Sequence, residues 1–325
     1  MRAIVRRAYG GPEQLEVVDV PTPQPGAQQV LVRVRAFGIN RAEQYFRTGA
    51  WGEVAVISGI ECVGEVVDDP SGRLDPGKRV LALMGGLGRT LPGSYAEFVC
   101  APAACVVPVR TTLAWDVLAA LPETYATAWS CLVDNLGLSR GQRLVVRGAN
   151  SALGQAAIDL AHHLGAHTIA IVRDLSRAER ARNLGAVEVL SDDGALAAKG
   201  LDIDAVLDLV GTSTVLDSLR ATRRGGRVCL AGFLGGGQPI ERFDPILHLP
   251  SGRHLSFFGS AFVYGTAEYP LSDIPFQRLV DLAECGALRV APRRVFDFDE
   301  IRAAHRVLDA QSANGKMVVV VPHAA

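Results

Sequence analysis

A glycine-rich segment in the middle of the chain carries the clearest chemical signal. It reads Val145-Val-Arg-Gly-Ala-Asn-Ser-Ala-Leu-Gly-Gln155 and lies between an apolar run and an apolar stretch of helical period. Gly148 and Gly154 bracket a turn in which Ser151 and Ala152 are small enough for a phosphate to approach the backbone. The segment predicts a dinucleotide site, although the G-x-G-x-x-G spacing is not intact. An ordinary strand-to-helix turn is the alternative.

A second candidate, Arg173, ends the next apolar strand. An acid at this point bonds a ribose 2′-hydroxyl, whereas an arginine pairs with a 2′-phosphate, so Arg173 favours NADPH. Asp174 beside it complicates this prediction, and a solvated surface arginine is the alternative. Val210, Gly232 and Phe233 follow later apolar strands, where ligands of open α/β sheets bind. We expect the nicotinamide half of the cofactor near them, unless these are ordinary glycine turns.

These residues need a scaffold of alternating strands and helices. From about Leu118 the chain alternates in this way, and Gly165 and Gly185 close two of the helices. The pattern predicts a doubly wound parallel sheet, a Rossmann domain, over residues 119–260. The expected elements are strands at Leu144–Val146, Thr168–Val172, Ala205–Leu209 and Arg227–Ala231, and helices at Ala126–Leu136, Leu153–Leu164 and Arg177–Leu184.

The rest of the chain has a different residue pattern. Short β-branched runs separated by Gly and Pro turns, such as Pro21-Thr-Pro-Gln-Pro-Gly26, indicate an irregular β domain. The regular alternation of strands and helices is lost after about Gly259. The chain ends in a hairpin-like strand over Lys316–Val321. We expect residues 1–118 and 261–325 to form this second domain, which makes the fold class α/β.

Composition narrows the function classes. The 33 Lys and Arg residues balance 34 Asp and Glu residues, so no global charge favours nucleic acid or an anionic membrane. No apolar run reaches the roughly 18 residues of a membrane helix, and the N-terminus lacks a secretory apolar region, so we expect a cytoplasmic protein. The six cysteines include no C-x-x-C pair and fit reduced thiols. Small-molecule chemistry fits these features.

Several motifs recur in one order along the whole chain. They are Gly38-Ile-Asn40, Gly59-Ile-Glu-Cys-Val-Gly64, Pro76-Gly-Lys-Arg-Val80, Gly93-Ser-Tyr-Ala-Glu97, Thr127-Ala-Trp129, Gly148–Gln155 and Thr168–Asp174. In these motifs the chain resembles the quinone oxidoreductase and enoyl reductase branch of the medium-chain dehydrogenase/reductase superfamily. The resemblance implies a GroES-like catalytic domain, NADPH, and a homodimer. It also implies cofactor contacts from Thr127, Asn150 and Leu153.

The same resemblance exposes a missing metal site. Zinc-dependent relatives hold their metal through cysteine, histidine or acidic ligands in the first domain. This chain has Asn40 and Ile60 at two of those positions, and Glu123 near the third. All seven histidines lie after residue 150, and the lobe with four cysteines is absent. We therefore predict no metal.

Without a Lewis acid, an electron-poor alkene or quinone is a better hydride acceptor than an alcohol. Asn40 or a main-chain N–H can donate to the carbonyl oxygen that gains charge, unless Asn40 only supports a turn. The resemblance places Trp51 where enoyl thioester reductases have a proposed proton-donating tyrosine. Indole is not a useful acid, so solvent or Tyr45 supplies the proton. Trp51 then shapes a planar apolar pocket, or simply packs.

Two other functions remain open. An enoyl thioester reductase acting on a coenzyme A or carrier substrate would need a basic entry, which Arg41 and Arg47 allow. An NADPH-binding sensor without catalysis is the other.

Overall fold

A computed structural model describes residues 1–322 of the chain. It divides into two compact units, Met1–Glu123 with Ser260–Ala325, and Thr124–Gly259. We call them unit 1 and unit 2. Unit 1 contains both the N-terminal and the C-terminal parts of the chain.

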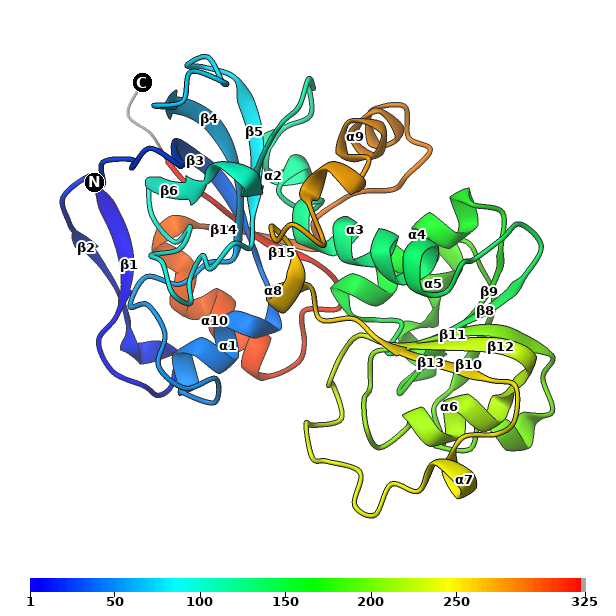
Figure 1. The fold of residues 1–325 in the computed structure, drawn as a ribbon. Coiled ribbons are helices and arrows are strands. Elements are labelled where there is room, and N and C mark those ends of the chain that lie inside the picture. Colours follow the sequence, from blue (N-terminus) through cyan, green and yellow to red (C-terminus); the bar gives the residue numbers. More distant parts are fainter. Residues whose placement is uncertain (323–325) are drawn as a thin grey trace. The chain divides into compact units, whose positions relative to one another are not determined.

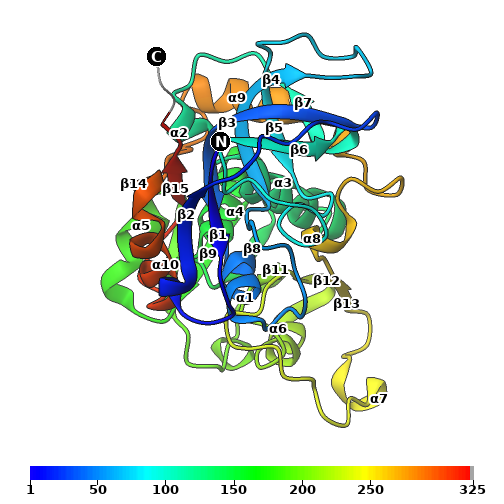
Figure 2. The same ribbon diagram turned by 90° about the vertical axis from the view of Figure 1, so that its left-hand side faces the viewer.

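Unit 1 is built around the long strand β3. The larger sheet has the order β14-β15-β3-β4-β5-β7, with β6 also paired to β3, while β1 and β2 form a separate antiparallel ribbon (Figure 2). The strands are β1 (Arg2–Arg6), β2 (Leu15–Asp19), β3 (Gln29–Ile39), β4 (Glu61–Asp68), β5 (Arg79–Leu83), β6 (Phe98–Pro102), β7 (Val106–Pro108), β14 (Arg294–Asp297) and β15 (Met317–Val320). Alternate β3 side chains, including Val30, Val32 and Val34, are fully buried in the core.

The end of the chain differs from the predicted hairpin. The strand β15 pairs antiparallel with β3 and parallel with β14. The helix α10 (Ile301–Asp309) lies between β14 and β15 in sequence, and this return of the chain makes the two strands parallel.

Helices also occur where the sequence predicted only an irregular β domain. Unit 1 contains α1 (Arg41–Thr48), α2 (Trp115–Leu118), α8 (Ser260–Val263), α9 (Phe276–Glu284) and α10. Short 3₁₀ turns lie at Pro12–Gln14, Ala103–Cys105, Leu271–Asp273 and Phe298–Glu300. The helices α1 and α10 lie side by side (Figure 1). This pairing joins an early segment of the chain to a late segment within unit 1.

Unit 2 is a six-stranded parallel sheet with the order β10-β9-β8-β11-β12-β13. Its strands are β8 (Arg143–Arg147), β9 (His167–Val172), β10 (Ala186–Ser191), β11 (Ile203–Asp208), β12 (Thr222–Leu230) and β13 (His254–Phe257). The sequence missed β10 and β13, the two edge strands, because they carry several exposed side chains rather than a continuous apolar run. The predicted combination of an irregular β domain and a doubly wound parallel sheet is confirmed.

Helices cover both faces of this sheet. They are α4 (Ala152–His163), α5 (Ala178–Asn183), α6 (Val215–Ala221) and α7 (Pro245–His248), with 3₁₀ turns at Leu175–Arg177 and Ala197–Lys199. Figure 1 shows α4 and α6 on opposite faces. The expected helix over Ala126–Leu136 is α3 (Pro122–Trp129), continued by a π-helix at Ser130–Asn135. Within the described residues, no helix is long and apolar enough to cross a membrane.

Candidate active site

The glycine-rich segment forms a tight turn between β8 and α4. Gly148 follows the strand with φ of 78°, in the left-handed region that favours glycine. A Cβ on Gly154 would lie 2.5 Å from the carbonyl oxygen of Gly148, so α4 can approach the turn this closely only with glycine there. Asn150 lies in the turn between them. Both glycines are therefore required by geometry, one by its backbone angle and the other by close packing.

The start of α4 presents N–H groups from the same turn. Ser151 caps the helix, and its hydroxyl oxygen accepts a hydrogen bond from the Gly154 N–H at 3.0 Å. The first N–H groups of a helix have no carbonyl partner inside the helix, which leaves those of Ala152 and Leu153 to bind other acceptors. Together with the helix dipole, such N–H groups favour an anion at this end of the helix.

Arg173 directly follows β9 and is exposed. Its neighbour Asp174 is engaged within its own turn, where it accepts from the Ser176 N–H at 2.9 Å and pairs with Arg177 at 3.5 Å. The hydrogen bonds from Ser176, and then the charge of Arg177, lower the pKa of the Asp174 carboxyl. Asp174 therefore acts as a cap for the 3₁₀ turn.

The loops after β11 and β12 are bonded to each other. Backbone hydrogen bonds of 3.0 and 2.8 Å join the carbonyls of Leu209 and Val210 to the loop that begins with Gly232 and Phe233. A Cβ on Gly232 would lie 2.7 Å from the Leu209 carbonyl oxygen, so this approach also requires glycine. Thr127, another predicted cofactor contact, lies outside these loops and is buried on α3. Unit 2 thus brings Val210, Gly232 and Phe233 together.

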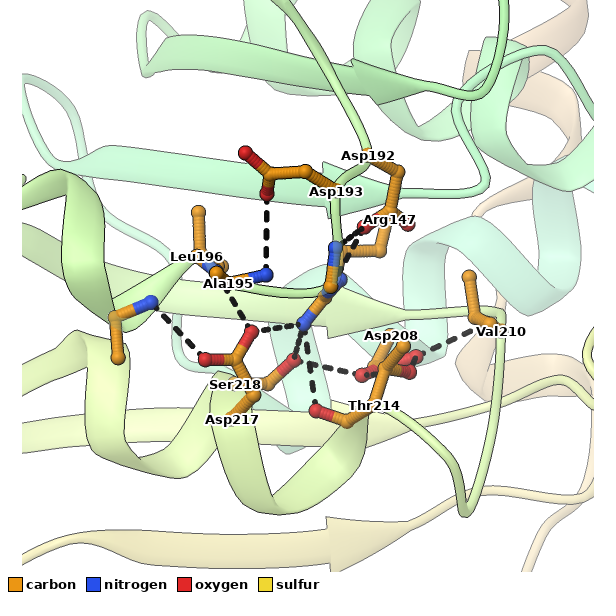
Figure 3. Close-up of polar contacts among 12 residues, drawn as sticks. Arg147, Asp192, Asp193, Ala195, Leu196, Asp208, Val210, Thr214, Asp217 and Ser218 are labelled. Atoms are coloured by element: carbon orange, nitrogen blue, oxygen red, sulfur yellow. Dashed lines mark hydrogen bonds and ion pairs between the residues drawn. The ribbon is translucent and has the colours of Figure 1, made fainter.

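Sequence reasoning missed the carboxylate that shapes the first of these loops. Asp208, the last residue of β11, is fully buried and accepts hydrogen bonds from the N–H groups of Val210 and Gly211 at 3.0 and 3.1 Å (Figure 3). It also accepts from the hydroxyls of Thr214 and Ser218. A lone aspartate within the apolar run Val206–Val210 was the available signal, because an isolated buried acid needs partners.

In unit 1, Asn40 is held on both sides of its amide. Its Nδ2 donates to Glu61 Oε1 at 2.8 Å, and its Oδ1 accepts from Lys316 Nζ at 2.6 Å. Lys316 also pairs directly with Glu61. An amide carries two N–H bonds, so one remains for another acceptor after the bond to Glu61. The orientation of the Asn40 amide is therefore fixed, with its oxygen toward the lysine.

The charges around Asn40 are buried. Glu61 and Glu43 have no exposed surface, and Lys316 is 5% exposed. Glu43 accepts from the backbone N–H of Asn40 at 2.8 Å, and burial raises the pKa of its carboxyl to about 7. Charged groups are rarely buried without partners. Lys316 stands just before an apolar run in the sequence, and this position was the signal that could have indicated a buried lysine.

These residues do not fit a zinc ion. The ammonium of Lys316 already contacts the Asn40 side-chain oxygen and Glu61, so a second cation would meet a positive charge there. Ile60 offers no ligand atom. In the part of the chain that the structure describes, no three His, Cys, Asp or Glu side chains are grouped to hold a metal.

Aromatic rings surround Trp51. Its ring stacks on Tyr45, with centroids 6.1 Å apart, and on Phe262 at 5.4 Å, with interplanar angles of 30° and 23°. Phe46 meets it edge-on at 5.7 Å. The structure thus brings Tyr45 and Trp51 together, and it adds Phe262 from a distant part of the sequence.

Arg47, which the sequence allowed as part of a basic entry, is buried and does not contribute to one. Its side chain is 1% exposed, donates to His305 Nδ1 at 3.1 Å, and pairs with Asp309 at 2.5 Å. His305 in turn shares a hydrogen bond with the Tyr95 hydroxyl, and burial, aided by the charge of Arg47, lowers the pKa of His305 to about 3. Because α10 packs beside α1, Arg47 serves the core rather than the surface.

Two protein families match the chain in sequence. The alcohol dehydrogenase GroES-like domain matches residues 26–111, within unit 1. The family described as zinc-binding dehydrogenase matches residues 152–276, most of which lie in unit 2.

Three proteins illustrate the similarity over most or all of the chain. Quinone oxidoreductase of Mus musculus is 26% identical over 341 residues, which cover 99% of this chain and 98% of that protein. Polyketide synthase GfsB of Streptomyces halstedii is 29% identical over 301 residues, but the match spans 91% of this chain and only 5% of that protein. A mycobacterial protein solved in complex with NADPH has a TM-score of 0.84 and 27% identity, covering 98% of this chain and 99% of that one.

Proposed function

The chain belongs to the quinone oxidoreductase branch of the medium-chain dehydrogenase/reductase superfamily, and we propose that it is an NADPH-dependent, zinc-independent reductase. Its acceptor is a quinone or the activated C=C of an α,β-unsaturated carbonyl compound. The observation that carries this proposal is the Lys316–Asn40–Glu61 network, in which a buried ammonium and a carboxylate fix the amide of Asn40, the residue that the resemblance aligns with a zinc ligand.

Unit 2 holds the cofactor in this proposal. The turn from Gly148 to Gly154 and the first N–H groups of α4 bind the pyrophosphate, and the exposed Arg173 pairs with the 2′-phosphate. Val210, Gly232 and Phe233 line the nicotinamide half. The mycobacterial NADPH complex supports this choice of cofactor. When bound, NADPH supplies the hydride.

Unit 1 handles the acceptor. As hydride reaches the acceptor, negative charge develops on its carbonyl oxygen, and a hydrogen-bond donor fixed in advance stabilises that charge. The remaining N–H of Asn40 is such a donor, because Lys316 and Glu61 hold the amide in one orientation. Trp51 and its neighbouring rings provide a planar apolar surface for the acceptor. The proton comes from solvent or from Tyr45.

A second copy of the chain is the proposed protein partner. The strand β13 is an edge strand of the unit 2 sheet, with Leu255 and Phe257 exposed at 42% and 53%. An exposed edge strand with apolar side chains is a template for pairing with another strand. We therefore propose a homodimer, with the cytoplasm as its location and a small electron-poor molecule as its substrate.

An enoyl thioester reductase is the second candidate, and the match to a polyketide synthase favours it. A coenzyme A or carrier substrate needs a basic entry. Because Arg47 is buried, Arg41 is the remaining candidate for that entry. No feature of the described residues favours a sensor that lacks catalysis.

Steady-state oxidation of NADPH distinguishes these functions. We expect turnover with quinones or enones, measured by the loss of NADPH absorbance, and much weaker turnover with enoyl thioesters. Efficient turnover only with thioesters would select the second candidate. Tight NADPH binding without turnover of any acceptor would instead indicate a sensor.

A further inference from the structure

Arg147 occupies a special place in the unit 2 sheet. It is the last residue of β8, and its register partner on the adjacent strand β11 is Asp208, the last residue of that strand. In a doubly wound sheet, the crevice at the carboxyl ends of these two central strands is the dinucleotide site. The Arg147 side chain is nevertheless fully buried, so it does not itself face a ligand in solvent.

The guanidinium of Arg147 joins two separate parts of the chain (Figure 3). One terminal nitrogen donates to Asp192, which follows β10, at 2.8 Å. The other donates to Asp217 on α6 at 2.8 Å and to the Thr214 carbonyl at 3.3 Å. A planar guanidinium can reach several acceptors in fixed directions at once, which an ammonium cannot.

The acids in this cluster order two backbone segments. Asp217 accepts from the N–H groups of Leu196 and Ala197 at 2.8 and 3.1 Å, in the segment after β10. Asp208 accepts from Val210 and its neighbour in the segment after β11. Ser218 links the two halves, because its hydroxyl donates to Asp208 at 2.7 Å and accepts from Arg147 at 3.2 Å.

The charge of Arg147 holds this arrangement together, in addition to the shape of its guanidinium. Asp192, Asp208 and Asp217 surround one guanidinium, and Asp208 is fully buried. Burial alone would lower the pKa of Arg147, but the bonds and charges of these aspartates raise it overall, so it stays charged. Without the guanidinium, the acids would repel one another and the two segments would separate.

We propose that Arg147 is a positioning residue for the cofactor, which holds the segments after β10 and β11 in the arrangement that receives a dinucleotide. The proposal rests on the proposed function of unit 2 as a dinucleotide domain. Arg147 acts on parts of the site that NADPH and NADH share, whereas Arg173 acts on the 2′-phosphate. Loss of Arg147 therefore weakens both cofactors equally.

The test compares Arg147→Lys with wild type and with Arg223→Lys. Arg223 pairs with Asp204 in β11, outside the cluster, so it provides the same substitution as a control. Fluorescence titration with NADPH and with NADH should show both dissociation constants raised by about tenfold in Arg147→Lys, with their ratio unchanged. The Arg223 variant should match wild type.

A second readout requires no ligand. Hydrogen exchange at the amides of Leu196, Ala197, Val210 and Gly211 should accelerate in Arg147→Lys, while amides in the middle of β8 keep their wild-type rates. If Arg147→Lys does not fold, Asp192→Asn removes one arm of the cluster and should also raise both dissociation constants.

Three results would overturn the proposal. They are unchanged affinity for both cofactors in the folded variants, weakened binding of NADPH alone, and unchanged exchange at the four amides. If wild type itself binds neither dinucleotide, the proposed function fails, and the exchange comparison still decides whether Arg147 orders these segments.

Discussion

Lys316 donates a hydrogen bond to the side-chain oxygen of Asn40 over 2.6 Å, although 276 positions separate the two residues in sequence. The bond sets which end of the amide faces the lysine. The amide nitrogen then points to Glu61, and one N–H remains for another acceptor. The proposed donor to the carbonyl oxygen of the acceptor therefore depends on contacts between distant parts of the sequence.

Replacing Lys316 by methionine should destabilise unit 1 and release the amide. Glu61 would lose its buried counter-charge, so we expect the free energy of unfolding to fall by about 3–5 kcal/mol. Urea denaturation measures the change. The double variant Lys316→Met with Glu61→Gln removes both charges and should recover part of the loss. A single variant as stable as wild type would mean that the ion pair contributes nothing to folding.

The sequence predicts elements well where the pattern is local. The strand, turn and helix around Gly148 are such a case, since the apolar run, the small residues and the helical period are adjacent. The edge strands β10 and β13 were missed because edge strands lack the continuous burial that marks a central strand.

The candidate sites were less predictable, because long-range contacts assign their roles. Asn40 was one candidate donor from its amide chemistry, but only folding shows that Lys316 and Glu61 orient it. Arg47 looked like a surface cation because nothing near it in sequence indicates His305 or Asp309 as partners. Arg147 and Asp208, which each have several partners, lie in apolar runs where no local rule assigns them a role.

Arg173 should set the preference for NADPH over NADH. A charged hydrogen bond to the 2′-phosphate contributes roughly 1.5–3 kcal/mol, which corresponds to about tenfold to a hundredfold in affinity. Fluorescence titration of Arg173→Ala should show weaker NADPH binding and unchanged NADH binding. Equal affinity of wild type for the two cofactors would instead make Arg173 an ordinary surface residue.

Glu43 should make stability depend on pH. Its pKa is raised from 4.5 to about 7 in the folded protein, so its contribution is complete below about pH 4.5 and is lost as pH rises through 7. Between these values the folded state binds the proton and the unfolded state does not. The stability of wild type relative to Glu43→Gln should therefore fall by roughly 2 kcal/mol from about pH 5 to about pH 7, by urea denaturation. A constant difference would show that Glu43 stays ionised.

Trp51 should affect the acceptor more than the cofactor. The ring lies in unit 1 between Tyr45 and Phe262, whereas the proposed phosphate contacts belong to unit 2. Trp51→Ala should lower kcat/KM for a quinone by about tenfold or more and leave the NADPH dissociation constant unchanged. Trp51→Phe, which keeps a planar ring, should lose less. Equal losses in acceptor and cofactor handling would assign the ring a purely structural role.

The most direct test of the central claim follows hydride from cofactor to acceptor. Protein dialysed against a chelator is mixed with NADPH deuterated at the transferred position and with a simple enone, and the product is examined by mass spectrometry and NMR. We predict one deuterium at the β-carbon of the saturated ketone, undiminished activity after chelation, and no comparable oxidation of simple alcohols with NADP⁺. Activity that disappears on chelation and returns with zinc, or alcohol oxidation as efficient as enone reduction, would contradict the proposed mechanism.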